Sequence, residues 1–514
     1  MKFQNTILFL LLLQLFFVCS VMIADDQKTH TEKPNVLFII TEDTHWNVFG
    51  CYGNTVCKTP NIDKLASSGV RFEHAYCQGS ACNATRTSFI NGLRPATTQL
   101  WKNPQRIRDV LPEGVVGMPE LFKESGYTTI DIGKFYHNGN EFAPKQMLAF
   151  DRIEHFGKPE GWQGPEPILK FPNAKPDWNK KAKPRTNSEP QNEEQRKKLY
   201  SDSYGDSGLD QENEGDWRSA QIAVALLEQY AADKSTDKKP FFMTLGQARP
   251  HTPYISPTKF ATLYDPEKIP DPPAPLASLK DFPYINRTTG GNPDIFRESP
   301  ASPKEVKEAI AAYYGCVTFV DDNLGLVLNA LEKTGLDKNT IVILIGDHGV
   351  HLGDHNMWAK YSLLEGTHRA PLIIRVPGAK ENSKVSREIV EFVDILPTLI
   401  DFCGLRNPGN LEGISLKSLL QENVAAAWKK AAFLTDQDQG QAVRTKKYSY
   451  MEFGEPKRTA GFEAALFDLE KDPNETVNLI NDPAYADVKK ELAELLHQGW
   501  KSALPPHIAA QKTN

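Results

Sequence analysis

The chain has 514 residues, of which 40% are hydrophobic and 24% are charged, and its formal net charge is −6. This length is enough for a large core and predicts one big domain plus a smaller one. Because the charges are spread without long single-sign blocks, the composition argues against nucleic acid as a partner, while a local basic pocket for an anionic substrate stays compatible with it.

The first 24 residues predict a signal peptide for secretion. Lys2 supplies the positive start, and residues 7–18 form an apolar run with a single interruption, which is typical of a segment removed on export. A membrane anchor is the alternative, but the run is short for a span and no second apolar run reaches membrane length. A lipid anchor on Cys19 is disfavoured because Val18 is bulky where a small residue is expected. We expect an exported protein, periplasmic or secreted, without stable membrane insertion.

Residues 35–41 form a continuous apolar run of strand length, which predicts a buried parallel strand. Glu42 and Asp43 follow at once, at the carboxyl end of that strand, where ligands bind in open α/β sheets. Two adjacent carboxylates at such a place are costly without a cation, so a divalent metal is the natural explanation. A solvated pair of loop residues is the alternative.

Residues 80–95 begin with small side chains, contain Cys82 and continue with the pattern of a helix. Ser80 or Cys82 could cap this helix, and Gly92 marks its end. Free N–H groups and the positive end of the dipole make a helix start a good place to hold an anion. Arg86 lies four residues after Cys82 and so reaches back over the same face. A buried cysteine at the start of an ordinary helix is the alternative.

Seven cysteines are too few for a disulfide scaffold. Cys51, Cys57 and Cys77 could include one bridge, which the sequence does not pair. A formal glycosylation sequon begins at Asn83, inside the predicted helix. A glycan there would block the proposed site, so we do not expect the sequon to be used.

Three further apolar runs, at 128–132, 240–246 and 340–346, predict buried strands, and polar side chains follow each of them. In chain order these side chains are Lys134 and His137, then His251, then Asp347 and His348. Lysine and histidine suit a sulfate or phosphate group, whereas a surface lysine and a structural histidine are the alternatives. Because parallel strands end at one edge of a sheet, we expect all four strand ends to meet there, joined by the Cys82 helix and by Lys360.

The remaining sequence predicts a mixture of helices, strands and insertions. Helices are expected at 59–66, 216–230 with Asp216 as cap, 304–334 and 393–399, and strands at 372–376, 443–453 and 466–469. Two segments without periodicity, 156–215 and 265–303, predict surface insertions. We expect a signal peptide at 1–24, a catalytic domain at 25–380 and a smaller C-terminal α+β subdomain at 381–514.

The Cys82 stretch resembles the signature of the formylglycine-dependent type I sulfatases, through Cys82, Ala84 and Arg86 and through the Gly92 and Arg94-Pro95 that follow. In that family a formylglycine-generating or sulfatase-maturing enzyme oxidises the cysteine to an aldehyde, formylglycine (3-oxoalanine). The commoner signature has Pro where this chain has Ala84, and Ala is a known variant. The resemblance implies an alkaline-phosphatase-like α/β fold, with a large, mostly parallel sheet flanked by helices.

Within the family the chain resembles the iduronate-2-sulfatase branch, through residues 133–137, 250–253, 347–349 and 358–360. The resemblance implies a calcium site made by Glu42, Asp43, the formylglycine at position 82, Asp347 and His348. It also implies that Arg86, Lys134, His137, His251 and Lys360 are catalytic residues around the sulfate. Glu42 departs from the usual Asp, and calcium's flexible coordination accepts the longer side chain more easily than magnesium's octahedron does. His45 and Trp101 fall where branch members meet the sugar.

The mechanism that the resemblance implies starts from the hydrated formylglycine. One hydroxyl attacks the sulfur, and the second later expels the sulfate, which an ordinary serine could not do. Lys134 and Lys360 neutralise the sulfate oxygens, and His251 or His137 protonates the departing sugar oxygen. We expect hydrolysis of O-sulfate esters on a sulfated oligo- or polysaccharide, with 2-O-sulfated uronic acids of glycosaminoglycan or ulvan type as candidates. The alternatives are a phosphonate or phosphodiester hydrolase and an inactive sulfated-glycan-binding protein.

Overall fold

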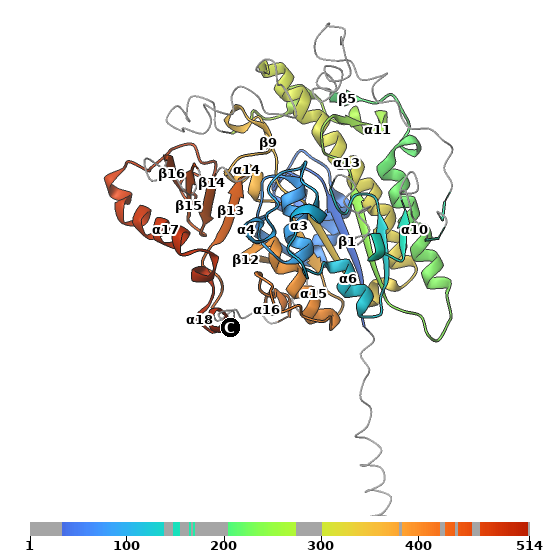
Figure 1. Ribbon diagram of the computed structural model, residues 1–514. Coiled ribbons are helices and arrows are strands. Elements are labelled where there is room, and N and C mark those ends of the chain that lie inside the picture. Colours follow the sequence, from blue (N-terminus) through green and yellow to red (C-terminus); the bar gives the residue numbers. More distant parts are fainter. Residues whose placement is uncertain are drawn as a thin grey trace, which may run out of the picture. The chain divides into compact units, whose positions relative to one another are not determined.

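An eight-stranded sheet forms the centre of the fold in the computed structural model of the chain (Figure 1). Its strand order is β12-β2-β11-β8-β1-β6-β3-β4. These strands are β1 (Asn35–Thr41), β2 (Val70–Tyr76), β3 (Thr128–Ile132), β4 (Arg152–Glu154), β6 (Phe241–Gln247), β8 (Thr340–Gly346), β11 (Leu372–Arg375) and β12 (Lys384–Glu391). The four buried strands predicted before residue 350 are therefore confirmed as β1, β3, β6 and β8.

The structure describes residues 33–137, 147–154, 164–165, 168–169, 204–273, 301–379, 383–421, 427–436, 440–454 and 463–511. Residues Asn35–Asn514 form one compact unit, distinct from Met1–Pro34. The predicted signal peptide lies outside the described residues, as do most of the insertion predicted at 156–215 and the greater part of the one predicted at 265–303.

Parallel pairing dominates the middle of the sheet. β1 pairs in parallel with β6 and β8, and β3 pairs in parallel with β6. β11 is the exception, because it runs antiparallel to both β8 and β2. β12 then pairs in parallel with β2, so the sheet includes a strand that lies after residue 380. The four strands that carry the predicted site residues are thus neighbours and end at the same edge.

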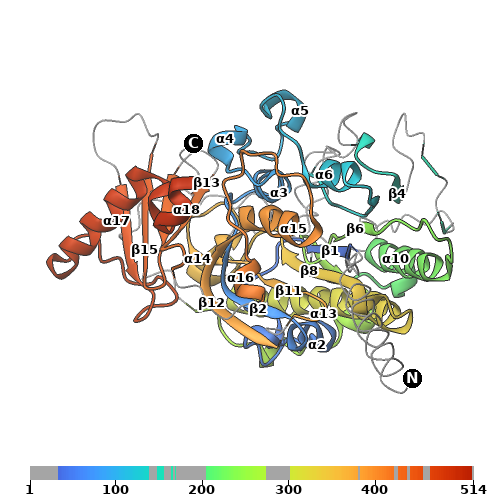
Figure 2. The same cartoon turned by 90° about the horizontal axis from the view of Figure 1, so that it is seen from below.

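Side chains of the central strands alternate between two hydrophobic cores, which explains their continuous apolar sequences. From β1, Val36, Phe38 and Ile40 pack into the core that includes side chains of α3, α6 and α15. Leu37 and Ile39 point to the other core, with α2, α10 and α13. Figure 2 shows α3 and α15 on one face of the sheet and α2 and α13 on the other. These helices are α2 (Pro60–Ser67), α3 (Cys82–Asn91), α6 (Met118–Glu124), α10 (Gly215–Ala232), α13 (Pro303–Lys333) and α15 (Ile395–Cys403).

The C-terminal part adds a second, antiparallel sheet in the order β13-β14-β15-β16, covered by α17. These elements are β13 (Ala432–Asp436), β14 (Gly440–Arg444), β15 (Tyr448–Phe453), β16 (Glu463–Asp468) and α17 (Ala486–Gln498). The expectation of α+β structure in this region is confirmed. A β-bridge between Gly79 and Thr435 joins this sheet to the segment that leads into α3.

The remaining elements are short. The strands are β5 (Tyr204–Asp206), β7 (Tyr254–Ser256), β9 (His351–Leu352) and β10 (Trp358–Ala359). The helices are α4 (Pro95–Thr98), α5 (Ile107–Val110), α11 (Thr258–Ala261), α14 (Glu365–His368), α16 (Lys417–Gln421) and α18 (Pro506–Gln511). β9 and β10 pair antiparallel and form the hairpin that leads to Lys360.

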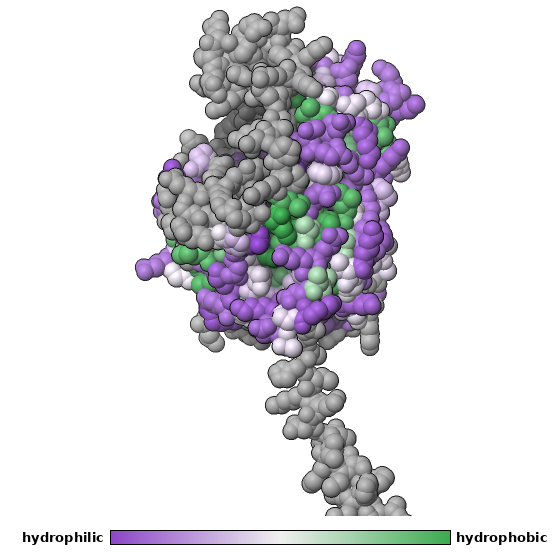
Figure 3. Space-filling model, turned by 90° about the vertical axis from the view of Figure 1, so that its right-hand side faces the viewer, coloured by the Kyte–Doolittle hydropathy of each residue, from purple (hydrophilic) through white to green (hydrophobic). Residues whose placement is uncertain are grey.

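Within the part of the chain that the structure describes, no helix is both long and apolar enough to cross a membrane. The coloured part of the face in Figure 3 is mainly hydrophilic, with hydrophobic side chains in groups between the polar ones. Cys51, Cys57 and Cys77 are free thiols, as are the other cysteines of the described residues, so the bridge considered above is not formed.

Candidate active site

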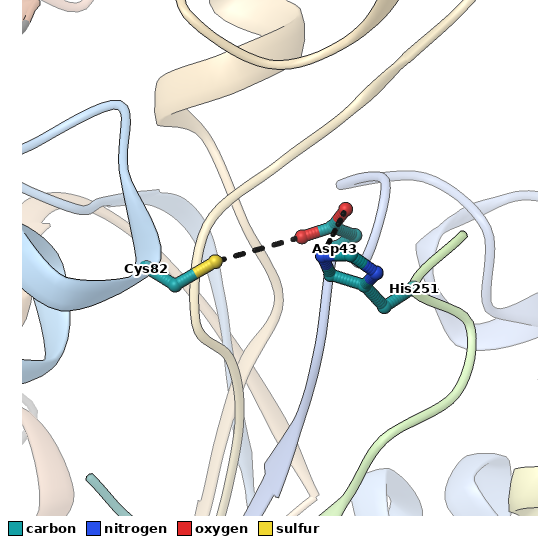
Figure 4. A group of neighbouring side chains, drawn as sticks. All are labelled: Asp43, Cys82 and His251. Atoms are coloured by element: carbon teal, nitrogen blue, oxygen red, sulfur yellow. Dashed lines mark hydrogen bonds and ion pairs between the residues drawn. The ribbon is translucent and has the colours of Figure 1, made fainter. Parts of the chain in front are cut away.

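Cys82 is the first residue of α3, and its thiol faces the carboxyl ends of β1 and β8. Its Sγ atom lies 3.1 Å from His348 Nε2, 3.3 Å from Lys360 Nζ and 4.0 Å from Asp43 Oδ1. Burial alone would raise the pKa of this thiol, but Lys360 and His348 outweigh burial and lower the pKa below its ordinary value. Figure 4 shows Cys82 pointing from α3 toward Asp43, with His251 on the other side of Asp43.

Asp43, two residues after β1, connects several of these groups. Lys360 Nζ donates to both of its carboxylate oxygens, at 2.8 and 3.0 Å. His348 Nε2 lies 3.3 Å from Oδ1, and His251 Nε2 lies 3.8 Å from Oδ2. Burial would raise the pKa of this carboxyl group, but His251, Lys360 and His348 hold it well below its usual range. Asp43 is therefore an anion that is surrounded by basic side chains.

Arg86 lies on the same face of α3 as Cys82 and forms hydrogen bonds with residues that follow three strands, β1, β3 and β8. Its Nε donates to Asp347 Oδ2 at 3.1 Å, and its Nη2 donates to Glu42 Oε1 at 3.0 Å. Its Nη1 donates to the carbonyl oxygens of Lys134 and Phe135, at 2.7 and 2.9 Å. The side chain is 1% exposed, so these contacts form in a water-poor interior where they are strong.

Glu42 pairs with two cations, Arg86 on α3 and Lys134 after β3. Lys134 forms an ion pair with Glu42 Oε1, the same oxygen that accepts from Arg86. Burial opposes ionisation, yet Lys134 and Arg86 lower the pKa of Glu42 to about 2. The predicted pair of adjacent carboxylates is therefore buried and ionised rather than solvated.

Three basic side chains beside the cluster differ in their exposure. Lys134 and His251 are 27% and 29% exposed at their side chains, whereas His137 is buried. His251 Nδ1 lies 2.8 Å from the carbonyl oxygen of Thr252, to which it donates, so Nε2 is the nitrogen that faces Asp43. His137 Nδ1 has no hydrogen-bond partner among the described residues. Burial, together with Lys134, lowers the pKa of His137 to about 3.

The acidic groups at this edge fit a divalent cation. Single ligand atoms of Cys82, Asp347 and His348 lie within 4.8 Å of one another, and so do those of Asp43, Cys82 and His251. His348 Nδ1 donates to the carbonyl oxygen of Gly349 at 2.8 Å, which directs Nε2 toward the same point. Each group combines one carboxylate oxygen with the side chain at position 82 and a histidine nitrogen, and carboxylate oxygens are ligands that hard divalent cations accept.

Two residues at this site have roles that their sequence context did not indicate. Asp216 was expected to cap its helix, but the cap of α10 is Glu214. The Asp216 carboxylate instead accepts from the backbone N–H groups of Ala248 and Arg249, both at 2.8 Å, and so holds the start of the loop that carries His251. No local pattern signals this contact, because the partners lie more than thirty residues away.

Asn103 is the second such residue. The prediction that Ser80 or Cys82 caps α3 is wrong, because the cap is Ala81, which offers no side-chain acceptor, and Ser80 bonds to Asp436. Asn103 Oδ1 accepts from the N–H of Asn83 at 3.1 Å, and Asn103 Nδ2 donates to the Tyr361 hydroxyl at 3.2 Å. Asn103 therefore links the first turn of α3 to the residue after Lys360.

Asn83, the first residue of the sequon, is buried, which agrees with the prediction that this sequon is not glycosylated. Its side-chain amide donates to the carbonyl oxygens of Lys102, Asn103 and Gln105, at 3.3, 3.2 and 2.7 Å. These bonds hold the loop that contains Trp101 against α3. His45 is half-buried beside Asp43, and its backbone N–H donates to the Tyr313 hydroxyl at 2.9 Å.

Comparison with known protein families identifies the family of this chain. Residues 34–405 match the family model described as Sulfatase, and residues 353–502 match the one described as N-sulphoglucosamine sulphohydrolase, C-terminal. A sulfatase of Formosa agariphila is 31% identical over 96% of this chain and 95% of its own. Human iduronate 2-sulfatase is 30% identical over 76% of this chain and 73% of its own. An ulvan-active sulfatase of Formosa agariphila is 26% identical over 92% and 82%.

Solved structures support the fold. A phosphonate monoester hydrolase of Agrobacterium radiobacter superposes with a TM-score of 0.71 over 91% of this chain and 95% of its own, at 21% identity. That likeness bears on the fold alone, which is the alkaline-phosphatase-like sulfatase fold. By the family model that covers most of its length, the chain belongs to the sulfatase family and is a sulfuric ester hydrolase.

Proposed function

We propose that the chain hydrolyses O-sulfate esters on sugars of a sulfated polysaccharide, with 2-O-sulfated uronic acids such as iduronate as the preferred class. The observation that carries this proposal is the position of the Cys82 thiol at the start of α3, within 3.3 Å of both His348 Nε2 and Lys360 Nζ. The similarity to human iduronate 2-sulfatase and to an ulvan-active sulfatase supports a sugar sulfate as substrate.

The proposed cofactors are a formylglycine at position 82 and a calcium ion. Formylglycine, installed by a maturing enzyme before or during export, would supply a hydrated aldehyde as nucleophile. Calcium would supply charge stabilisation at the sulfate and at the nucleophile. Asp43, Asp347 and His348 would hold the ion, because their ligand atoms converge on Cys82, and Glu42 would complete the site from the side of Arg86.

Lys360 and Lys134 are the residues that stabilise charge on the sulfate oxygens. Each ammonium is already held by a carboxylate, Lys360 by Asp43 at 2.8 Å and Lys134 by Glu42, so little reorganisation is needed when the substrate arrives. Arg86 does not reach the rim, because its side chain is buried and its hydrogen bonds go to Glu42, Asp347 and two carbonyl oxygens. It orients these carboxylates and lowers the cost of ionisation at position 82.

His251 is the proposed general acid for the departing sugar oxygen. Its Nδ1–H donates to the Thr252 carbonyl, so the second proton, which only the imidazolium form carries, is on Nε2 and faces the site. The side chain is 29% exposed at the rim. His137 is the weaker candidate because it is buried and Lys134 helps to keep it neutral. His137 would instead accept a hydrogen bond or donate one as a neutral ring.

A phosphonate or phosphodiester hydrolase is the alternative enzyme. Only the fold argues for it, since the structural neighbours with that activity are 21% identical. The sequence relatives are sulfatases over nearly the full chain, which favours the sulfate ester. A binding protein without activity would require that Cys82 remain a cysteine.

The test is a panel of defined sulfated oligosaccharides, assayed for released sulfate with protein co-expressed with a maturing enzyme. We expect release from a terminal 2-O-sulfated uronic acid, loss of release after calcium chelation, and a Cys82 peptide whose mass is that of formylglycine. Cys82→Ala should abolish release, and Cys403→Ala, a buried cysteine on α15, should keep it. Faster turnover of an aryl phosphate diester than of any sulfate, or full activity in Cys82→Ala, would contradict the proposal.

A further inference from the structure

Asp43 has a left-handed backbone, with φ of 44°. A residue other than glycine adopts this conformation rarely, and at a functional site it persists only where the surroundings fix it. Asp43 lies two residues after β1 and bears the carboxylate that contacts Lys360, His348 and His251. The direction of that carboxylate depends on the backbone conformation, so the groups that hold the backbone also aim the side chain.

Hydrogen bonds fix this backbone on both sides. On the β8 side, Asp43 N–H donates to Asp347 Oδ1 at 3.0 Å, and Thr44 N–H donates to the carbonyl oxygen of His348 at 3.1 Å. On the opposite side of the chain segment, the Tyr313 hydroxyl donates to the carbonyl oxygen of Asp43 at 2.7 Å and accepts from the N–H of His45 at 2.9 Å. A single phenol therefore spans the two peptide groups that flank Thr44.

The surroundings of Tyr313 fix the position of its hydroxyl group. It lies on α13, 270 residues along the chain from Asp43, and it is 0% exposed. Its ring packs edge-on against Tyr254, with 5.1 Å between centroids and 81° between the planes. Burial raises the pKa of the phenol well above its ordinary value, so the hydroxyl keeps the proton that it donates.

We propose that Tyr313 is a positioning residue of the active site: its hydroxyl holds Asp43 in the left-handed conformation and thereby aims the Asp43 carboxylate at Lys360, His348 and position 82. The role of Asp43 in the reaction rests on the proposed function, whereas its backbone geometry does not. Tyr313 itself does not touch the reacting atoms, because its hydroxyl is used by the two backbone groups.

The test replaces Tyr313 by Phe, which keeps the ring against Tyr254 and removes only the hydroxyl. Tyr314→Phe is the matched control, since the neighbouring phenol accepts from Asn54 Nδ2 at 3.3 Å and packs on Tyr264. The measurements are kcat and KM on an aryl sulfate, calcium affinity of chelator-treated protein by calorimetry, the melting temperature, and a crystal structure of each variant.

In Tyr313→Phe we expect kcat to fall by about 10- to 100-fold, because a small misplacement of a group in the active site lowers the rate by about this factor. Calcium affinity should fall by about 10-fold or more, as after loss of a residue that orients a ligand. The crystal structure should show Asp43 out of the left-handed region or off Lys360, while the melting temperature stays close to that of Tyr314→Phe.

Several results would overturn the inference. One is an unchanged Asp43 with intact contact to Lys360 in the crystal structure of Tyr313→Phe. Another is a kcat within about twofold of the wild type, and a third is an equal loss in Tyr314→Phe. If the wild type released no sulfate, the proposed function would fail, but the crystal structures and the calcium affinities would still decide the role of Tyr313.

Discussion

The molecule buries a cluster of opposite charges at each end of α3. At the N-terminal end, around Cys82, the cluster contains Glu42, Asp43, Asp347, Arg86, Lys134 and Lys360. Just beyond the C-terminal end, after Gly92, a second cluster contains Arg94, Glu391, Asp394 and Lys429. Both consist of carboxylates paired with basic side chains in the interior, but they differ in how far the pairing is complete.

The second cluster satisfies all of its carboxylate oxygens within the protein. Glu391 accepts from both terminal nitrogens of Arg94 at 2.7 Å, from Lys429 at 3.0 Å and from the N–H of Phe433 at 2.9 Å. Asp394 accepts from Lys429 at 2.8 and 2.7 Å and from the N–H groups of Glu391 and Ile414, both at 2.8 Å. Burial opposes ionisation of Glu391, yet Arg94 and Lys429 lower its pKa to about 2.

The cluster around Cys82 remains open on one side. Lys134 and His251 are partly exposed, and a ring nitrogen of His137 lacks a hydrogen-bond partner among the described residues. These basic groups have donor capacity left for an anion, whereas the terminal nitrogens of Arg94 and Lys429 bond to the carboxylates of their own cluster. Arg94 Nε, which has no hydrogen-bond partner among the described residues, is buried and not open to a ligand. The difference indicates two kinds of buried charge cluster. A cluster whose basic groups are partly exposed and incompletely paired marks a reactive site, whereas a cluster whose carboxylates are fully paired within the protein acts as a structural brace.

Arg94→Leu gives the largest expected effect on stability. It leaves Glu391 buried beside Lys429 without its bidentate partner, and removal of one member of a buried ion pair costs about 3–5 kcal/mol. Chemical denaturation should report a loss of this size in the free energy of unfolding. The kcat per folded molecule should be nearly unchanged, because the brace lies at the end of α3 remote from Cys82.

Arg406→Ala is the control for Arg94→Leu. Arg406 pairs with Glu124 at the surface, with about half of each side chain exposed, so its loss should cost about 1 kcal/mol or less. If Arg94→Leu kept full stability and lost turnover instead, the second cluster would belong to the active site and the contrast between the clusters would be wrong.

His251→Ala is expected to lower kcat on a sugar sulfate by about 100-fold, which equals about 3 kcal/mol of transition-state stabilisation, because the poor leaving group needs a proton. On 4-nitrophenyl sulfate, whose leaving group needs no acid, the loss should be much smaller. The ratio of the two losses is the measurement. His497→Ala, an exposed histidine beside Glu452, should leave both rates unchanged. Equal losses on the two substrates would argue that His251 binds the sulfate rather than protonating the sugar oxygen.

The open cluster was largely predictable from the sequence, since its carboxylates and Lys134 follow apolar runs that end at one edge of the sheet. Arg86, on α3, and Lys360, after the β9–β10 hairpin, do not follow such runs. Glu42, Lys134, His251 and Asp347 could be assigned to that edge because parallel strands buried on both faces have continuous apolar sequences. The helix that starts at Cys82 was predicted separately, from its own helical spacing and from Gly92 at its end.

The closed cluster was not predictable, although Arg94 belongs to the signature around Cys82. Its partners lie about 300 residues later, at the end of β12, and nothing in the local pattern of Glu391 distinguishes it from a surface glutamate. The same limit applies to Asp216 and Tyr313, whose hydrogen bonds go to distant backbone groups. Residues that act by holding backbone have no periodicity or spacing of their own.

Asn103→Ala gives the smallest expected effect. It tests whether the N-terminus of α3 depends on a capping side chain from another segment of the chain. Without Asn103, the N–H of Asn83 in the first turn loses its acceptor, and a lost helix cap costs about 1 kcal/mol. The link to Tyr361 beside Lys360 is lost as well, so kcat should fall severalfold while Arg94 and its brace are unaffected. Asn103→Asp keeps an acceptor at the helix start and should recover the stability, as thermal denaturation would show. If neither substitution changed stability or kcat, the first turn of α3 would be held by the sheet edge alone, and the Trp101 loop would have no part in positioning Cys82.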